Sequence, residues 1–320
     1  MNTPSAARFA VVGEAIVDVV TTGDGQTREL PGGSPANVAV GLARLGNAAT
    51  LLTQIGADAR GDLLRHHLAA NGVTIHQAAT AELPTSAAYT HVDPDGQPHY
   101  RFDVQWQVDT VSTPHGVTHA HVGSLGAFLE PGATAVRTWL GRAGVLASFD
   151  PNCRPALMGP PHAARRRVEE LVAAAGIVKA SDQDLAWLYP DTSIEDAAAR
   201  WLAAGPALVV VTQGADGAYA TTANATIRTG APRVRVVDSV GAGDSFMAAL
   251  ADGLHRQGLL DHQALTHAVP QTLHAVLTRS AAAAAITCTR PGADPPTLAE
   301  LDPFFHGTDR WAPSAADRSS

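Results

Sequence analysis

A glycine-rich stretch that ends in an acid is the strongest chemical signal in the sequence. It runs Asp-Ser-Val-Gly-Ala-Gly-Asp, from Asp238 to Asp244, and opens a segment of helical periodicity. Gly241, Ala242 and Gly243 allow successive backbone N–H groups to converge at a helix start, where the helix dipole also attracts an anion. A carboxylate beside a bound anion is useful if it accepts a proton from an attacking hydroxyl, as in phosphoryl transfer. Taken alone, the same residues also fit a glycine-rich turn with an aspartate N-cap.

A second group of polar residues lies near the N-terminus. Asp18 follows the first strand-like run, and the stretch that begins with Gly32 and Gly33 reaches Asn37. An acid and an amide together can accept and donate hydrogen bonds to vicinal hydroxyls, and glycines let a sugar approach the backbone closely. Each residue also has an ordinary interpretation, because Asp18 fits a turn and Asn37 fits the first turn of a helix.

The elements that must position these residues follow an alternating pattern. Apolar runs of strand length alternate with segments of helical period, and the run 207–211 is apolar enough for a central parallel strand. This alternation predicts an α/β fold with a doubly wound, mostly parallel sheet and helices on both faces. The run 233–237, just before the glycine-rich stretch, is predicted as a further strand.

One segment interrupts the alternation. Strand-like runs at 87–92 and 98–102 flank the turn 93–96, which predicts a β-hairpin inserted around 84–106 as a candidate lid. Residues 1–8 are predicted as an N-terminal extension. From about 303 to 320, Gly, Asp, Pro and Ser dominate, which predicts a disordered tail.

Composition excludes several classes of function. The 320 residues are 45% hydrophobic and 16% charged, which is typical of a globular chain, and the formal net charge is −8. That charge argues against nucleic acid or a membrane surface as a partner. No leader, membrane span or disulfide framework is evident, so we expect a soluble cytoplasmic protein. No Gly-x-Gly-x-x-Gly follows the first strand and no Walker-type loop occurs, which argues against a dehydrogenase and a P-loop enzyme.

With these motifs in place, the chain resembles the ribokinase-like (PfkB) carbohydrate kinases, and most closely the bacterial fructokinases. The resemblance covers roughly residues 9 to 300, within a predicted kinase domain at 9–302. The matching motifs, in the order of the family, are Gly32–Gly46, His121–Leu125, Asp150–Pro155, Val211–Gly217, Asp238–Asp244 and Thr287–Gly292.

The resemblance implies a ribokinase-like fold with a small β lid and an ATP-dependent sugar kinase. Asp244 would be the catalytic base, and the amides of Gly241, Ala242 and Gly243 would neutralise charge on the transferring phosphoryl group. Arg154 would reach either phosphate or substrate. The residues implied to contact the sugar are Asp18, Gly32, Gly33, Asn37, Tyr89, Phe102 and Asp244.

The resemblance also implies how the nucleotide and metal ions are bound. Thr212, Gly214 and Gly217 would lie along ATP, and Asp238 with the Val240 carbonyl would bind K⁺. The family usually has Asn-x-x-Glu where this chain has Ser181-Asp-Gln-Asp184, so Asp184 would organise Mg²⁺ through water with a shorter side chain.

The sequence leaves the sugar open. Fructose is the first choice, and 2-keto-3-deoxygluconate, ribose and nucleosides are alternatives within the family. In a strand, Arg101 would point away from the face of Tyr100 and Phe102, which weakens a site for an acidic sugar. Trp106 and Tyr89 could stack on the substrate or pack a homodimer through the lid. A catalytically silent sugar- or nucleotide-binding regulator is the alternative of another class, although it has no chemical reason to keep Asp244.

Overall fold

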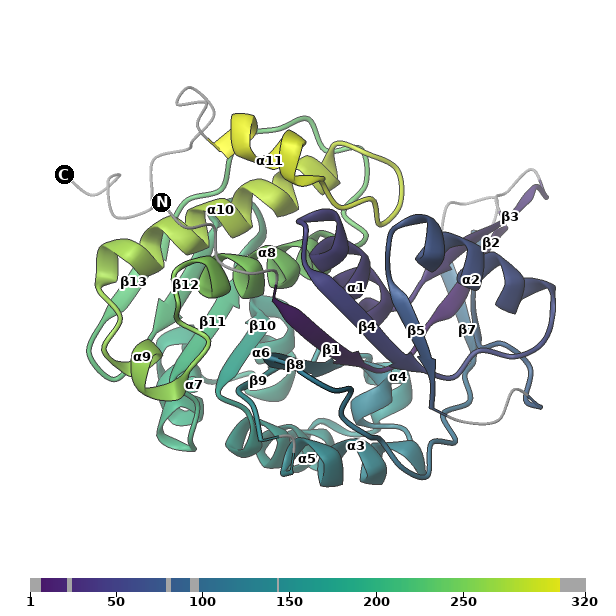
Figure 1. The fold of residues 1–320 in the computed structure, drawn as a ribbon, viewed down its shortest axis with the longest axis horizontal. Coiled ribbons are helices and arrows are strands. Elements are labelled where there is room, and N and C mark those ends of the chain that lie inside the picture. The colour runs from purple at the N-terminus through teal and green to yellow at the C-terminus, as the bar shows by residue number, and fades with distance from the viewer. Residues whose placement is uncertain (1–6, 22–24, 79–81, 93–97, 143, 306–320) are drawn as a thin grey trace.

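The protein is described from a computed structural model, which covers residues 7–21, 25–78, 82–92, 98–142 and 144–305 (Figure 1). The described chain forms a nine-stranded sheet and a separate four-stranded sheet. Among these residues, no helix has the length and apolar character that crossing a membrane requires.

The large sheet has the order β13-β12-β11-β10-β9-β8-β1-β4-β5, and it is parallel from β11 to β5. β12 and β13 add an antiparallel hairpin at one edge. The strands are β1 (Arg8–Val12), β4 (Ala48–Thr53), β5 (Thr74–Gln77), β8 (His119–Gly123), β9 (Ala147–Asp150), β10 (Ile177–Ser181), β11 (Leu208–Thr212), β12 (Ala218–Thr221) and β13 (Thr226–Thr229).

Helices cover both faces of this sheet, as the alternation predicted (Figure 1). In β11, Leu208 and Val210 join one core while Val209 and Val211 join the other, which explains the continuous apolar run. One face carries α1 (Ser34–Arg44), α2 (Ala59–Ala70), α8 (Ala242–Arg256), α9 (His262–Thr266) and α10 (Pro270–Cys288), with α11 (Leu298–Phe305) outside α10. The other carries α3 (Gly132–Leu140), α4 (Pro155–Met158), α5 (Pro161–Ala174), α6 (Asp182–Leu188) and α7 (Ile194–Ala203), with the short turns η1 (Leu125–Ala127) and η2 (Gly214–Asp216) in connecting loops.

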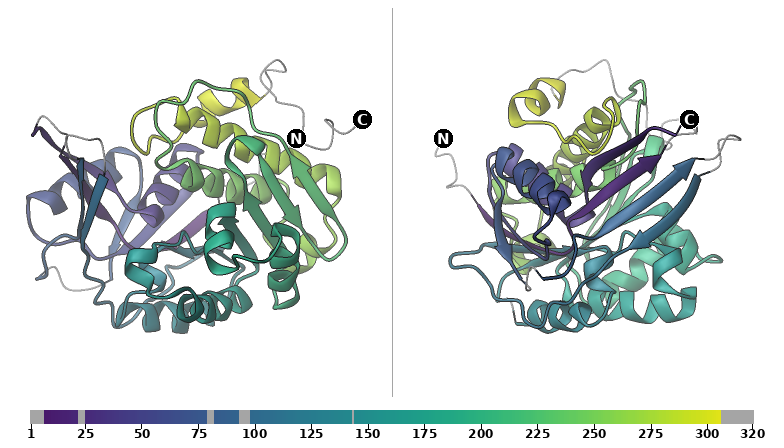
Figure 2. Two further views of the ribbon diagram at one scale, coloured as in Figure 1. Left: turned by 180° about the vertical axis from the view of Figure 1, so that it is seen from behind. Right: turned by 90° about the vertical axis from the view of Figure 1, so that its right-hand side faces the viewer.

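The four-stranded sheet, which we call the lid sheet, lies at the β5 end of the large sheet (Figure 2). Its order is β3-β2-β6-β7, in which β2 and β6 are parallel and the other neighbours antiparallel. The strands are β2 (Ile16–Thr21), β3 (Thr27–Gly32), β6 (Ala87–Val92) and β7 (Pro98–Asp103). The predicted hairpin is therefore present as β6 and β7, and the turn at 93–97 lies outside the described residues.

Several sequence predictions about elements need correction. The lid contains two strands that were missed, so Asp18 lies inside β2 rather than in a turn after the first strand. The run 233–237 is not a strand: the Val237 amide donates to the Cys288 carbonyl at the end of α10. At the ends, Arg8 already belongs to β1 and α11 extends to Phe305, while residues 1–6 and 306–320 lie outside the described residues.

Candidate active site

The glycine-rich stretch forms the start of α8, as the sequence predicted. Gly241 is the N-cap residue with a left-handed φ of 74°, and a Cβ there would lie 2.5 Å from the Ala293 side chain. Glycine is therefore needed at this position for both conformation and space. Ala242 and Gly243 occupy the first turn, where helix N–H groups lack intrahelical acceptors. The Ala242 amide makes a long turn hydrogen bond of 3.2 Å to the Ser239 carbonyl.

Asp244 lies in the same turn, buried and held by two side chains of α1. Its Oδ1 accepts a hydrogen bond from Ser34 Oγ at 2.6 Å, and its Oδ2 accepts one from Asn37 Nδ2 at 2.8 Å. The two helices approach closely because Gly41 of α1 faces Ala248, where a Cβ would lie 2.7 Å away. The N-terminal ends of α1 and α8 thus meet and fix the carboxylate.

Ser34 was missed in the sequence, although a signal for it exists. Ser34 and Asn37 are three residues apart, and both lie in the first turn of α1, so they share one face. Asn37 was expected to bind sugar hydroxyls. That role stays a prediction, and the structure shows in addition that Asn37 orients Asp244.

Asp18 faces the same region from the lid sheet. A Cβ on Gly32 would clash with the Asp18 carboxylate, so the glycine leaves room for the acid. Gly33 has a φ of 99° and a Cβ there would lie 2.6 Å from the Glu14 carbonyl oxygen, which lets the chain pass from β3 into α1. Burial raises the pKa of Asp18 to about 6, Arg154 opposes that rise and Asp244 adds to it.

The strand register decides which lid residues share the face of Asp18. Leu30, Asp18, Ala88 and Phe102 are successive partners across the four strands, so Phe102 lies on the Asp18 face. Tyr89 belongs to the next row, whose residues point to the opposite face.

The strand register therefore gives no support to the expectation that Tyr89 contacts the substrate. Its hydroxyl accepts a hydrogen bond from Arg60 of α2, and the Arg101 guanidinium lies 4.0 Å from its ring centroid. These contacts turn the ring towards α2 and away from Asp18. Trp106, also considered for stacking, is 2% exposed and packs in the core beside Gly132.

Arg154 lies in the loop between β9 and α4, close enough to Asp18 to lower its pKa. The guanidinium donates to the Asn152 side-chain oxygen at 2.7 Å and to backbone carbonyls of the loop. Asn152 itself has a left-handed φ of 38°. The exposed Arg154 is thus held near Asp18. The hydrogen bonds that hold it in this loop go to an amide oxygen and to backbone carbonyls, not to a carboxylate.

The predicted role of Asp184 in Mg²⁺ binding is not supported. Asp184 Oδ1 accepts from the Cys153 amide at 2.7 Å, and Oδ2 accepts from both the amide and the hydroxyl of Ser181. Ser181 and Asp184 form a capping box at the start of α6. Three donors already occupy this buried carboxylate, so Asp184 fastens the 152–154 loop to α6 and has at most one acceptor position left for a water molecule.

Sequence reasoning also missed a buried ion pair at this edge of the sheet. Lys179, in β10, donates to Asp150 Oδ2 at the end of β9 over 2.8 Å, and both side chains are at most 5% exposed. Burial raises the pKa of Asp150 to about 6, which Lys179 opposes and Asp184 and Asp244 reinforce. The pair therefore lies among the carboxylates that surround the start of α8.

The segments predicted for the nucleotide lie at the same edge. Thr212 ends β11 and is the register partner of Ser181 at the end of β10. Gly214 and Gly217 flank the short turn after it, with left-handed φ values of 54° and 92°. Val236 and Val237 precede the glycine-rich stretch and are 63% and 59% exposed, so two adjacent apolar side chains lie at the surface here.

Asp238 joins two loops beside this surface. Its Oδ1 accepts from the Val240 amide at 3.0 Å, and its Oδ2 accepts from the Gly292 amide at 2.8 Å. The loop before α8 and the loop after α10 are thus in contact. This is the place where the sequence analysis expected K⁺.

Two other features lie apart from this site. His119 and His121 both contact Ser148 Oγ at 2.9 Å, and burial lowers the pKa of each to about 3, so both are neutral. In the described chain, no three His, Cys, Asp or Glu residues gather as metal ligands.

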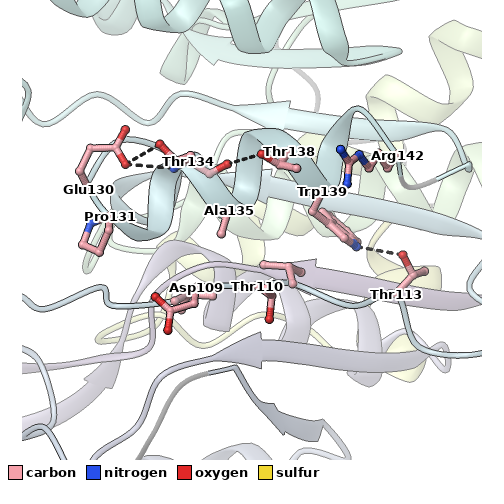
Figure 3. A pocket seen from close by; sticks show the side chains of 12 residues that line it. Asp109, Thr110, Thr113, Glu130, Pro131, Thr134, Ala135, Thr138, Trp139 and Arg142 are labelled. Atoms are coloured by element: carbon pink, nitrogen blue, oxygen red, sulfur yellow. Dashed lines mark hydrogen bonds between the residues drawn. The ribbon is translucent and has the colours of Figure 1, made fainter.

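A cavity of about 660 Å³ lies between the segment 108–113 and α3, and its lining includes none of the residues around Asp244 (Figure 3).

A carboxylate oriented at the N-terminus of a helix, with a second acid facing it from a lid, defines a site suited to phosphoryl transfer onto a hydroxyl. Comparison with known proteins agrees. Residues 6–300 match the profile of the pfkB family carbohydrate kinases. A fructokinase from Klebsiella pneumoniae is 34% identical over 265 residues, which cover 79% of this chain and 86% of the relative.

Solved structures agree as well. The fructokinase from Xylella fastidiosa with bound ATP has a TM-score of 0.80 at 26% identity, over 93% of this chain and 97% of that chain. A double mutant of fructokinase from Vibrio cholerae O395, in a fructose, ADP and potassium ion bound form, has a TM-score of 0.78 at 27% identity. The match covers 95% of this chain and 100% of that one. The chain belongs to the pfkB family of carbohydrate kinases, and it is a phosphotransferase that acts on a sugar hydroxyl.

Proposed function

We propose that the protein transfers the γ-phosphate of ATP to a hydroxyl of a neutral sugar, with fructose as the first candidate. The observation that carries this proposal is the buried Asp244 carboxylate, fixed by Ser34 and Asn37 at the start of α8. The neighbouring helix terminus can stabilise a phosphoryl group, and Asp18 faces the same space from the lid sheet. One region thus offers a base, an anion site and a carboxylate that can accept hydrogen bonds from sugar hydroxyls.

In the proposed reaction, the sugar hydroxyl gives its proton to Asp244 as it attacks the γ-phosphorus. Ser34 and Asn37 keep the carboxylate oriented for that proton, which is the positioning that such transfers need most. The amides of Gly241 and Gly243 and the exposed Arg154 are suited to the charge on the phosphoryl oxygens. Asp18 and Phe102 would contact the sugar from the lid sheet, which would exclude water when it closes.

We propose that ATP lies along the carboxyl end of β11, over Thr212, Gly214 and Gly217. The exposed Val236 and Val237 offer an apolar surface for the adenine base of ATP. Mg²⁺ would be held by the phosphates and by water, the usual arrangement for this ion in kinases, because three donors already occupy the Asp184 carboxylate. ATP is present in the Xylella fastidiosa fructokinase.

We also propose that K⁺ binds at the loop of Asp238 and Val240. Asp238 already holds this loop to Gly292, so the loop before α8 and the loop after α10 lie close together around its carboxylate. The Vibrio cholerae enzyme has a potassium ion bound form. A cation at this loop would add to the positive charge that the start of α8 presents to a phosphoryl group.

The lid favours a neutral sugar. Arg101 stacks on Tyr89 at the face opposite Asp18, so it is not available to hold the carboxylate of an acidic sugar such as 2-keto-3-deoxygluconate. Phe102, on the Asp18 face, offers an apolar contact to a sugar ring. Fructose is the preferred candidate also because the Klebsiella pneumoniae relative is a fructokinase.

The test is ADP release by the purified protein with Mg·ATP and K⁺ over fructose, ribose, 2-keto-3-deoxygluconate, glucose and several nucleosides. We expect fructose to give the highest kcat/KM, and Asp244→Ala to lower kcat by several orders of magnitude while ATP still binds. Near-normal turnover by Asp244→Ala would overturn the assignment of the base. Silence over the whole panel, with ATP bound, would favour the regulator.

We further propose a homodimer through the open face of the lid sheet. Leu30 is 44% exposed there, and half-buried Phe102 shares its row. A second lid would cover these side chains and close the sugar site of both copies. Sedimentation velocity should show a dimer for the wild type and a monomer for Leu30→Glu. A wild-type monomer at micromolar concentration would contradict the proposal.

A further inference from the structure

Lys179 has no role among the residues assigned above, yet its position is unusual. The residue lies in β10 with its side chain buried, and its ammonium pairs with Asp150 at 2.8 Å. Removing two charges from water is unfavourable, and an apolar pair of similar size is often at least as stable. Stability alone therefore does not account for the pair at this place.

Gly243 shows what the ammonium lies against. Unlike Gly241, Gly243 has no left-handed φ, so its backbone would accept any residue. A Cβ built at this position would meet one atom within 4 Å, and that atom is Lys179 Nζ at 2.9 Å. The first turn of α8 thus has a gap on its inner side, and the ammonium fills it.

The surroundings keep this group charged. Burial alone would lower the pKa of Lys179, but the carboxylates of Asp150, Asp184 and Asp244 raise it. A positive charge beside the first turn of α8 adds to the partial positive charge of the helix terminus. Because water is largely excluded here, the effect of such a charge on a nearby anion is greater than at the surface.

Resting on the phosphoryl transfer proposed above, we propose that Lys179 supplies the fixed positive charge of the anion site, held against Gly243 by Asp150. No bond forms to the lysine and its proton stays in place, while the proton of the sugar hydroxyl passes to Asp244. The ammonium stabilises negative charge on the phosphoryl group from behind the helix start, and Gly243 is glycine because a side chain would displace that charge.

The first test separates this role from a structural one. Lys179→Met should lower kcat about 100-fold, with the KM values for sugar and ATP changed only a few-fold. Its affinity for ADP with aluminium fluoride and sugar, which mimic the transferring phosphoryl, should fall in parallel, while its affinity for ADP alone stays unchanged. The matched control is Arg279→Met, which removes a cation from the buried pair with Asp252 on the same helix α8. It should lower the melting temperature and leave kcat unchanged.

Lys179→Met leaves the buried Asp150 without its cationic partner, so the double variant Lys179→Met/Asp150→Asn is made alongside it. This variant has neither charge, and it should show the same loss of kcat if the ammonium is what matters. Wild-type kcat in either folded variant would overturn the inference. A wild-type protein inactive on every sugar would instead overturn the proposed function, and the inference with it.

A mutant cycle tests the contact with Gly243. Gly243→Ala should lower kcat at least tenfold when Lys179 is present, because the methyl group displaces the ammonium. In a Lys179→Ala background the space is vacant, and the same substitution should have little further effect. Equal effects in both backgrounds would show that Gly243 acts independently of Lys179 and would contradict the inference.

Discussion

The Asp244 carboxylate of this kinase is oriented by residues that come from another part of the chain. Asp244 belongs to α8, whereas both of its side-chain donors, Ser34 and Asn37, belong to the first turn of α1. A charged group makes stronger hydrogen bonds than a neutral one, so each donor contributes measurably to its orientation. The positions of single residues thus depend on how two helices meet.

Ser34→Ala is expected to lower kcat about tenfold, because one charge-assisted hydrogen bond to Asp244 is lost. Ser34→Thr keeps the hydroxyl and should retain most of the activity. Steady-state kinetics on the preferred sugar, with circular dichroism to verify folding, measures both. Equal activity in the alanine and threonine variants would contradict the role of the hydroxyl.

The acid facing Asp244 predicts a pH dependence. With its pKa raised to about 6 by burial, Asp18 is ionised above that pH and protonated below it. Only the ionised form accepts two hydrogen bonds from sugar hydroxyls, so kcat/KM for the sugar should fall as the pH drops through about 6. The profile is measured from pH 5 to 8.5. In Asp18→Asn, kcat/KM for the sugar should be low at every pH, without the fall near pH 6. If the variant still showed that fall, another group would be its cause.

At the scale of elements, short connections between the ends of strands and helices hold the site together. The loop after β9 carries Arg154, and Asp184 fastens that loop to the start of α6. An experiment can distinguish this clamping role of Asp184 from a role in binding Mg²⁺.

Asp184→Ala should reduce the free energy of unfolding by about 2–3 kcal/mol, because three hydrogen bonds to a buried carboxylate are lost. Urea denaturation measures this effect, and a Mg²⁺ titration of kcat should give the wild-type midpoint. Ser181→Ala, which removes the cap but keeps the bond to Cys153, should cost about 1 kcal/mol. A large rise of the Mg²⁺ midpoint in Asp184→Ala would restore Asp184 as a metal ligand.

At the scale of the whole molecule, the lid sheet is joined to the large sheet through the short segment between β1 and β2. Glu14 lies in this segment, buried, and its Oε2 accepts from the Gly126 amide at 2.7 Å. Burial raises the pKa of Glu14 to about 7. Hydrogen bonds from Gly126, Ser124 and Leu125 lower the pKa and so oppose this rise. The junction between the two sheets thus contains a carboxyl group that favours its neutral form.

The folded state therefore binds a proton at Glu14 that the unfolded state releases from about pH 4.5. The stabilisation is complete below that pH and is lost as the pH rises through about 7, with a total of about 3 kcal/mol. Glu14→Gln should lack this component. Denaturant unfolding at pH 5 and pH 8 should show the stability of the wild type falling relative to Glu14→Gln, and parallel changes in both proteins would contradict the assignment.

Much of the fold and part of the site could be predicted because the signals are local. The alternation of apolar runs indicates the doubly wound sheet, and a glycine-rich helix start followed by an acid indicates the anion site and Asp244. The lid was predicted incompletely because β3 is polar and largely exposed, so its pairing with β2 leaves little trace in the sequence. The face of Tyr89 could not be predicted, because neighbouring strand residues point to opposite faces and only the fold shows which of the two faces α2 covers.

By itself, the sequence determined the fold class and the family, and it singled out Asp244 as the proposed base, since each depends on residue types at short spacings. Only the tertiary structure decided that Ser34 and Asn37 hold Asp244, that Asp184 is a structural clamp, and that Lys179 lies against Gly243. These contacts join segments far apart in the chain. They exist because parallel strands end at one edge of the sheet and bring their loops together there, which no local pattern specifies.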